Sequence, residues 1–347
     1  MIVREMAPVN LEMPFASLDG FITPVERFYV RCHHPIPQLD PATWKLEIEG
    51  EVDNPYSLDH ADLAAMELRT ITSTMECAGN GRMFLEPQRD GAQWEGGAVG
   101  TAEWTGVPLA HLLARAGVRD SASEVILIGG DLGEIKDPPR PQGKIHYSRS
   151  LPLEKANSDV LLALRMNGRP LDPSHGFPLR AIVPGWYGMA AVKWLTRIVV
   201  SKEPYQGYYQ TIDYSYWERR SKSPTLLPIT AMRVKSQIAR PAFAEVVPAG
   251  QPYRVQGAAW TSGADIIRVE ITTDAGGTWN DALLLGEPVA DAWRLWEYDW
   301  TVPAKIGETV LMARATDSQG RVQPPRHHDD RGSYLIHHWL PVTVLIR

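Results

Sequence analysis

Cysteine is scarce in this chain of 347 residues, where only Cys32 and Cys77 occur. Two cysteines cannot supply a disulfide framework, so nothing in the sequence indicates an oxidising compartment. No Cys-x-x-Cys-His run is present, which excludes covalent c-type haem and leads us to expect no haem in this chain. No apolar run approaches the ~18 residues that would span a bilayer, so we expect no contact with a membrane. The N-terminus lacks the apolar core of a signal peptide, so we expect a cytoplasmic location, or a periplasmic one if a leader has been removed.

Positive charge is also in the minority. Lys and Arg total 35 against 41 Asp and Glu, which gives a formal net charge of −6. A protein that binds nucleic acid needs a broad excess of cations to displace counterions. The composition therefore argues against a nucleic-acid partner, and any anionic ligand must be attracted by local arginines.

The first two thirds of the chain mix short helices with many strands. We expect strands at residues 44–50, 69–76, 125–128, 175–185 and 192–200 from their apolar patterns. Helices are expected from Ser57 to about residue 66 and at residues 108–117, where a glycine ends the second one. Asn167 and Gly168 predict a hairpin turn. Without regular βαβ alternation, this pattern is typical of an α+β domain.

The last third contains no further helical pattern. Short strands are expected at residues 253–258, 266–273, 293–300, 310–316 and 340–346, with turn residues between them. Strands of this length and spacing predict a β-sandwich of immunoglobulin-like form. A stretch rich in Ser, Lys and Pro precedes them, so we place the domain boundary near residue 225, with domains at 1–224 and 225–347.

Residues 75–82, with the sequence MECAGNGR, place one cysteine at the start of a glycine turn. A metal-bound or reactive thiolate needs nearby positive charge and little steric bulk, which Arg82, Gly79 and Gly81 could supply. On these residues alone, an inert buried thiol is the simpler interpretation of Cys77.

Several other segments accompany this turn in order along the chain. They are FYVRCHHP at 28–35, WEGGAVGTAEWTG at 94–106, HGFPLR at 175–180, VKWL at 192–195, Asp213-Tyr214, IRVEI at 267–271, GTW at 277–279, and Arg331-Gly332 ahead of Trp339. With the CAGN of the turn and Arg82, these segments resemble the sulfite oxidase family of molybdopterin-dependent oxidoreductases, in its haem-free bacterial or plant-like type. The resemblance covers roughly residues 20–346. It implies a molybdopterin-binding catalytic domain followed by a domain that forms a homodimer.

The resemblance also implies roles for individual residues. The metal ligand would be Cys77, a soft donor that suits molybdenum. The catalytic residues around an oxyanion substrate would be Arg31, Arg82, Trp94, Tyr214 and Arg331. The residues that bind the molybdenum–molybdopterin cofactor would be Tyr29, Arg31, His33, Cys77, Asp131, His175, Arg180 and Lys193.

The implied reaction is the oxidation of sulfite to sulfate, with electrons passed to an external acceptor such as a cytochrome or oxygen. Two positions depart from the family pattern: Cys32 replaces an asparagine beside Arg31, and Ala190 lies where many members carry an arginine. A molybdenum reductase of the same fold, acting on nitrate or a sulfoxide, is therefore an alternative. So is a member that binds the cofactor without oxidising sulfite, and, in another class, a non-catalytic β-sandwich binding module.

Overall fold

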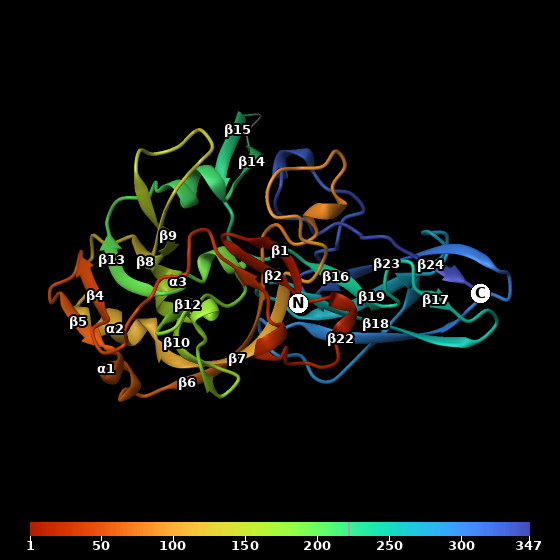
Figure 1. The fold of residues 1–347 in the computed structure, drawn as a ribbon, viewed down its shortest axis with the longest axis horizontal. Coiled ribbons are helices and arrows are strands. Elements are labelled where there is room, and N and C mark those ends of the chain that lie inside the picture. The colour runs from red at the N-terminus through yellow and green to blue at the C-terminus, as the bar shows by residue number, and fades with distance from the viewer. Residues whose placement is uncertain (221–222) are drawn as a thin grey trace.

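The computed structural model describes residues 1–220 and 223–347. Figure 1 shows two parts side by side: a broad N-terminal part of mixed sheets and short helices, and an elongated C-terminal part made of strands. The N-terminus lies where the two parts meet, and the C-terminus lies at the far end of the second part. The chain therefore has an α+β part followed by a β-sandwich.

Two five-stranded sheets form the N-terminal part. One has the order β11-β10-β7-β6, with β12 also paired to β10, and the other has the order β5-β4-β13-β8-β9. The strands of the first sheet are β6 (Arg69–Glu76), β7 (Val99–Pro108), β10 (Leu161–Met166), β11 (Arg169–Pro170) and β12 (Arg180–Ile182). Those of the second are β4 (Lys45–Gly50), β5 (Tyr56–Asp59), β8 (Glu124–Glu134), β9 (Lys144–Pro152) and β13 (Leu195–Ser201).

Short helices and a small sheet complete this part. The α-helices are α1 (His60–Ala64), α2 (Leu109–Ala116) and α3 (Leu153–Ser158). Single helical turns are η1 (Phe15–Ser17), η2 (Val25–Arg27), η3 (Arg82–Phe84), η4 (Pro173–His175), η5 (Gly188–Ala190) and η6 (Tyr209–Asp213). A three-stranded sheet contains β1 (Ile2–Met6), β2 (Val9–Glu12) and β3 (Val30–Arg31).

The C-terminal part is a sandwich of two sheets with the orders β16-β18-β22-β21 and β17-β24-β23-β19-β20. The first sheet contains β16 (Lys235–Arg240), β18 (Pro252–Trp260), β21 (Leu283–Leu284) and β22 (Arg294–Thr301). The second contains β17 (Val246–Val247), β19 (Ile266–Thr272), β20 (Asn280–Asp281), β23 (Gly307–Asp317) and β24 (Val342–Ile346), and the helical turn η7 (Asp329–Arg331) precedes β24.

The two parts share a packed boundary. Trp260 and Trp293 of the sandwich belong to the same buried apolar cluster as the core of the N-terminal part. The backbone N–H of Trp293 also donates to Oγ1 of Thr74 in β6, at 2.7 Å. Because large aromatic side chains contribute much of the burial energy of a core, this boundary holds the sandwich close to the end of β6.

The hairpin of β14 (Ser215–Arg220) and β15 (Ser223–Pro228) connects the two parts and projects from the upper edge of the molecule in Figure 1. The predicted boundary at residue 225 falls inside β15. A division between residues 224 and 225 therefore stays a prediction, which we place within this hairpin.

Most of the predicted elements are confirmed. Strands β4 and β6, helix α2 and the turn at Asn167-Gly168 occur at the expected positions. Gly117 ends α2 with φ +69°, a conformation that glycine adopts without steric cost. The apolar face of α2 is buried at the spacing of one helix face, as its sequence indicates.

Three predicted bounds are wrong. Ser57 does not cap α1, because it lies in β5; Asp59 caps the helix instead, and its side chain accepts the backbone N–H of Asp62. The strand expected at 175–185 is limited to β12, since helical turn η4 occupies residues 173–175. Strand β8 is longer than the apolar run 125–128, because its glycine-containing continuation also pairs with β9.

Buried histidines make the stability of the fold depend on pH. Burial lowers the pKa of His338 to about 4 and that of His337 to about 3, below the usual 6.5. Between these values and 6.5 the unfolded chain binds more protons, so the free energy of unfolding should fall as the pH falls from about 6.5 to about 4. Denaturant titrations across this range should show the decrease. His338→Gln should make this decrease in the free energy of unfolding smaller, and the exposed control His111→Gln should leave it unchanged. The same decrease in wild type and both variants would show that His338 does not cause it.

Candidate active site

A cavity in the N-terminal part gathers most of the predicted site residues. It contains about 620 Å³ of space free of protein atoms, part of it open to solvent. The predicted residues that line it are Tyr29, Arg31, His33, Cys77, Asp131, His175, Arg180, Lys193 and Tyr214. These residues come from separate strands and turns, and the fold brings them together in one cavity.

Cys77 lies directly after β6, where the chain turns back on itself. Its backbone N–H donates to the carbonyl of Ala98 at 2.8 Å, and its own carbonyl accepts the N–H of Asn80 at 2.9 Å. Gly81 has φ +96°, which favours glycine, and a Cβ at Gly79 would displace the guanidinium of Arg82. The thiol is 6% exposed and faces the cavity.

The charge around Cys77 is mixed. Burial raises the pKa of this thiol, whereas the nearby guanidinium groups of Arg31 and Arg82 act in the opposite direction. A metal cation bound to sulfur would remove the cost of the buried thiolate, because a metal-bound thiol is deprotonated.

Two buried cations line the cavity away from the thiol. The Arg180 guanidinium donates to the carbonyl of His175 at 3.0 Å, and its buried Nε finds no hydrogen-bond partner in the described part of the chain. Burial lowers the pKa of Arg180 to about 10. Lys193 Nζ donates to the carbonyl of Ser174 at 2.8 Å and lies 3.3 Å from Sγ of Cys32. The hydrogen-bond partners of both cations are neutral, and Asp131 acts on Lys193 only through its charge, so the pair suits an anionic ligand such as a phosphate.

Asp131 contributes an acceptor to the same cavity. Its Oδ1 is buried and has no hydrogen-bond partner among the residues that the structure describes. Burial raises the pKa of this carboxyl to about 6, although Lys193 acts in the opposite direction. Buried polar atoms in proteins are nearly always paired, so this oxygen is suited to accept a hydrogen bond from a ligand N–H.

Tyr214 and His33 form a polar pair in the cavity. The Tyr214 hydroxyl lies 2.7 Å from Nε2 of His33, and the imidazole ring stacks on Tyr147 with centroids 4.4 Å apart. Burial raises the pKa of Tyr214 and lowers that of His33, which Arg31 lowers further. Both shifts favour the neutral forms, so the contact is a hydrogen bond between a neutral phenol and a neutral imidazole.

Three predicted catalytic residues do not line the cavity. Trp94, expected among the catalytic residues, is instead fully buried in the apolar cluster that contains Cys77. The Nε of Arg82 donates to the carbonyl of Ser333 at 3.0 Å, behind the turn. Arg331 lies with its guanidinium 5.6 Å from the ring centroid of Tyr216 and does not close over the cavity.

Sequence reasoning missed one prominent member of the cavity. Tyr147 lines it, and its hydroxyl donates to the carbonyl of Met189 at 2.7 Å. No motif pointed to this tyrosine, because its position depends on the pairing of β9 with β8. Cys32, which the sequence marked only as a departure from the family pattern, also lines the cavity and contacts Lys193.

Taken together, a thiol beside a guanidinium, two cations bonded to neutral atoms and an unpaired carboxylate oxygen form a cavity suited to a bulky anionic ligand that carries a soft metal. Two family models match this chain: "Oxidoreductase molybdopterin binding domain" over residues 33–209 and "Mo-co oxidoreductase dimerisation domain" over residues 227–344. The chain therefore belongs to the sulfite oxidase family of molybdenum-cofactor oxidoreductases.

Individual relatives agree with this assignment. Mitochondrial sulfite oxidase of Mus musculus is 36% identical over 93% of this chain, which spans 61% of the length of that relative. A nitrate reductase of Hordeum vulgare is 33% identical over 92% of this chain and 39% of its own length. Among solved structures, the sulfane dehydrogenase SoxCD of Paracoccus pantotrophus matches 98% of this chain and 85% of its own, with 27% identity and a TM-score of 0.84. The family thus contains members with different substrates.

The residues of the cavity fit the cofactor of this family. The cofactor carries a soft metal, a phosphate and a pterin with N–H donors, and the cavity offers a thiol, two free cationic side chains and the unpaired oxygen of Asp131. In residues 1–220 and 223–347, no helix is long and apolar enough to cross a bilayer.

Proposed function

We propose that the cavity binds a molybdenum cofactor and that the protein oxidises sulfite to sulfate. The balanced reaction is SO₃²⁻ + H₂O → SO₄²⁻ + 2H⁺ + 2e⁻, and the electrons pass to an acceptor outside this chain, such as a cytochrome or oxygen. The observation that carries the proposal is the presence of Cys77, Arg31 and Tyr214 in one cavity. The assembly is proposed to be a homodimer, which the dimerisation-domain match supports.

The cofactor would be held at both ends of the cavity. Cys77 would bind the metal, and Arg180 and Lys193, with His175 beside them, would bind the phosphate. Asp131 would accept hydrogen bonds from the pterin, and Tyr29 and His33 would pack against it. When bound, the cofactor supplies the oxygen-atom transfer and accepts the two electrons.

Substrate binding is proposed to depend on the arginines. The Arg31 guanidinium lines the cavity with Cys77 and can donate to an oxyanion, which a planar and permanently charged group binds well. Arg82 and Arg331 lie outside the cavity and would attract the anion through their charge. Trp94 would support Cys77 from behind, in the cluster that contains both side chains.

Tyr214 and His33 would manage protons. The Tyr214 hydroxyl can donate to the substrate oxyanion and help move protons there, while the His33 imidazole, 2.7 Å away, would orient the hydroxyl. Because the chain carries a formal net charge of −6, a small anion would have to be attracted by local arginines.

Nitrate reduction is the competing activity, because the Hordeum vulgare relative is nearly as similar to this chain as the Mus musculus one. Steady-state oxidation of sulfite with ferricyanide, compared with nitrate reduction by a reduced viologen dye, separates the two. We expect saturable sulfite oxidation and only background nitrate reduction. A molybdenum-loaded protein that reduces nitrate and leaves sulfite unchanged would refute the proposal.

A further inference from the structure

The C-terminal part holds the Cys77 turn from behind, through hydrogen bonds to every even-numbered residue from 76 to 82. The contacts are Lys235 Nζ to Glu76 Oε1 at 2.8 Å, Leu335 N–H to the Ala78 carbonyl at 2.9 Å, Lys235 Nζ to the Asn80 carbonyl at 3.1 Å, and Arg82 Nε to the Ser333 carbonyl at 3.0 Å. The odd-numbered Met75 and Cys77 line the cavity instead. The turn is therefore fixed on the face opposite the thiol.

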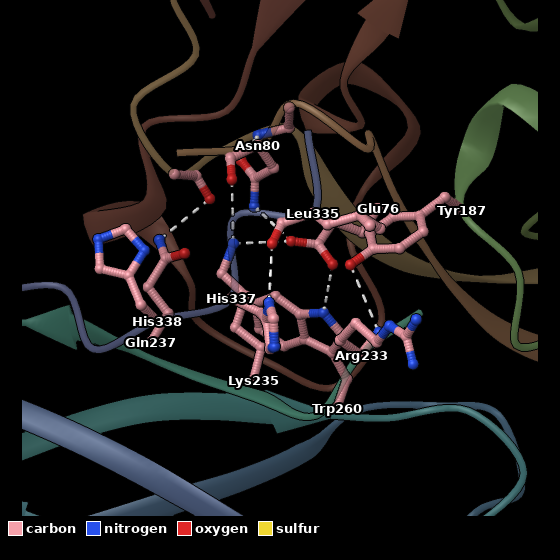
Figure 2. Close-up of polar contacts among 12 residues, drawn as sticks. Glu76, Asn80, Tyr187, Arg233, Lys235, Gln237, Trp260, Leu335, His337 and His338 are labelled. Atoms are coloured by element: carbon pink, nitrogen blue, oxygen red, sulfur yellow. Dashed lines mark hydrogen bonds and ion pairs between the residues drawn. The ribbon is translucent and has the colours of Figure 1, made fainter. Parts of the chain in front are cut away.

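The strongest of these contacts is an ion pair between Glu76 and Lys235, whose side chains are 2% and 0% exposed. Figure 2 shows the Glu76 carboxylate surrounded by donors from both parts of the chain. Its Oε2 accepts the indole N–H of Trp260 at 2.8 Å, and its Oε1 also accepts the side-chain amide of Asn80 at 3.1 Å. A buried carboxylate that accepts hydrogen bonds from three side chains is held in one position.

A continuous path of hydrogen bonds leads from this ion pair to the backbone of Cys77. Asn80, which Lys235 contacts, accepts the backbone N–H of Ala98 on its Oδ1 at 3.0 Å. The carbonyl of the same Ala98 accepts the N–H of Cys77 at 2.8 Å. A displacement of Lys235 or Glu76 would therefore be transmitted directly to the residue that carries the thiol.

We propose that Glu76 and Lys235 are positioning residues for the Cys77 turn, so that the C-terminal part takes part in building the metal site as well as in dimerisation. Their ion pair aligns the turn, and Lys235 neutralises a carboxylate on the residue next to the thiol. The proposal rests on the proposed function, because it takes Cys77 to be the molybdenum ligand.

Removing only one partner should disturb the site more than removing both. Lys235→Met leaves a buried carboxylate without its cation, which the turn can accommodate only by moving or taking up water. The double variant Glu76→Gln/Lys235→Met keeps similar side-chain volumes and removes both charges. We therefore expect the double variant to recover part of what the single variant loses, since the Asn80 carbonyl still lacks its Lys235 donor.

The test compares four proteins: wild type, Lys235→Met, the double variant, and a control that breaks an ion pair of the sandwich away from the turn. Glu270→Gln serves as this control, because Glu270 pairs with Arg314 at 2.8 Å within the β19–β23 sheet. Hydrogen exchange of residues 77–82 is measured in cofactor-free protein. Molybdenum content and the Mo(V) electron paramagnetic resonance signal are measured in loaded protein.

For Lys235→Met we expect exchange in the turn to accelerate on the order of tenfold, molybdenum content to fall, and the Mo(V) signal of the remaining loaded protein to shift. In all three measurements the double variant should lie between wild type and Lys235→Met, because it restores the charge balance but still lacks the Lys235 bond to the Asn80 carbonyl. Glu270→Gln should change none of the three. If Lys235→Met does not fold, Trp260→Phe removes one donor to Glu76 and should produce a smaller shift in the same direction.

Wild-type exchange and an unshifted Mo(V) signal in Lys235→Met would overturn the proposal, as would a double variant no better than the single one. These results leave the proposed function intact. A wild-type protein without molybdenum would instead contradict the proposed function, while the exchange measurement would still test the contacts of the turn.

Discussion

Cys77→Ser is expected to reduce sulfite turnover by at least about 1,000-fold, equivalent to about 4 kcal/mol of activation free energy. Serine is nearly the same size, and the backbone bonds of the turn to Ala98 and Asn80 do not involve the side chain. The hydroxyl, however, is a hard and weakly acidic donor that does not replace a thiolate on molybdenum. The measurement is steady-state ferricyanide reduction, normalised to folded protein.

The matched control is Cys32→Ser. Cys32 lines the same cavity, where its sulfur contacts Lys193, and it is as deeply buried as Cys77. Under this account Cys32→Ser changes the turnover rate far less than Cys77→Ser does. Wild-type activity in Cys77→Ser, or equal losses in the two variants, would show that Cys77 has no special role.

Arg180→Met is expected to lower cofactor affinity by roughly ten- to hundredfold, because hydrogen bonds to charged groups contribute about 1.5–3 kcal/mol. The same change should leave the cofactor-free protein as stable as before or more stable. It removes a buried cation that pairs only with neutral atoms, and such charges cost folding energy. Molybdenum analysis and denaturant unfolding of cofactor-free protein measure the two effects.

Arg180→Lys retains the charge and should recover part of the affinity. Arg314→Met, which removes an arginine paired with Glu270 in the sandwich, should leave molybdenum content unchanged. A cofactor-free Arg180→Met protein that is clearly destabilised while retaining full molybdenum content would contradict the role given to this arginine.

Local chemistry made much of the fold predictable. Helix α2 follows from the spacing of its leucines and from Gly117, and β6 follows from the apolar residues that lead into the turn. The residue that caps α1 was harder to predict from the sequence, because Ser57 and Asp59 are both good N-cap residues. Only the pairing of β5 with β4 decides between them.

The candidate site was predictable in its membership and less so in its geometry. Motifs placed Cys77 and Arg180 in one cavity, but they could not show that Trp94 is enclosed behind the turn or that Arg331 packs on Tyr216. The Glu76–Lys235 pair joins residues 159 positions apart and arises only from tertiary packing. Such contacts leave no local pattern in the sequence.

The central claim is that Cys77 binds molybdenum in this cavity, and X-ray absorption at the molybdenum edge tests it most directly. The spectra of wild-type and Cys77→Ser protein, both loaded with cofactor, are compared for the number of sulfur atoms bound to the metal. We predict one sulfur neighbour fewer in Cys77→Ser. Identical sulfur coordination in the two proteins, or a wild-type protein that takes up no molybdenum, would contradict the claim.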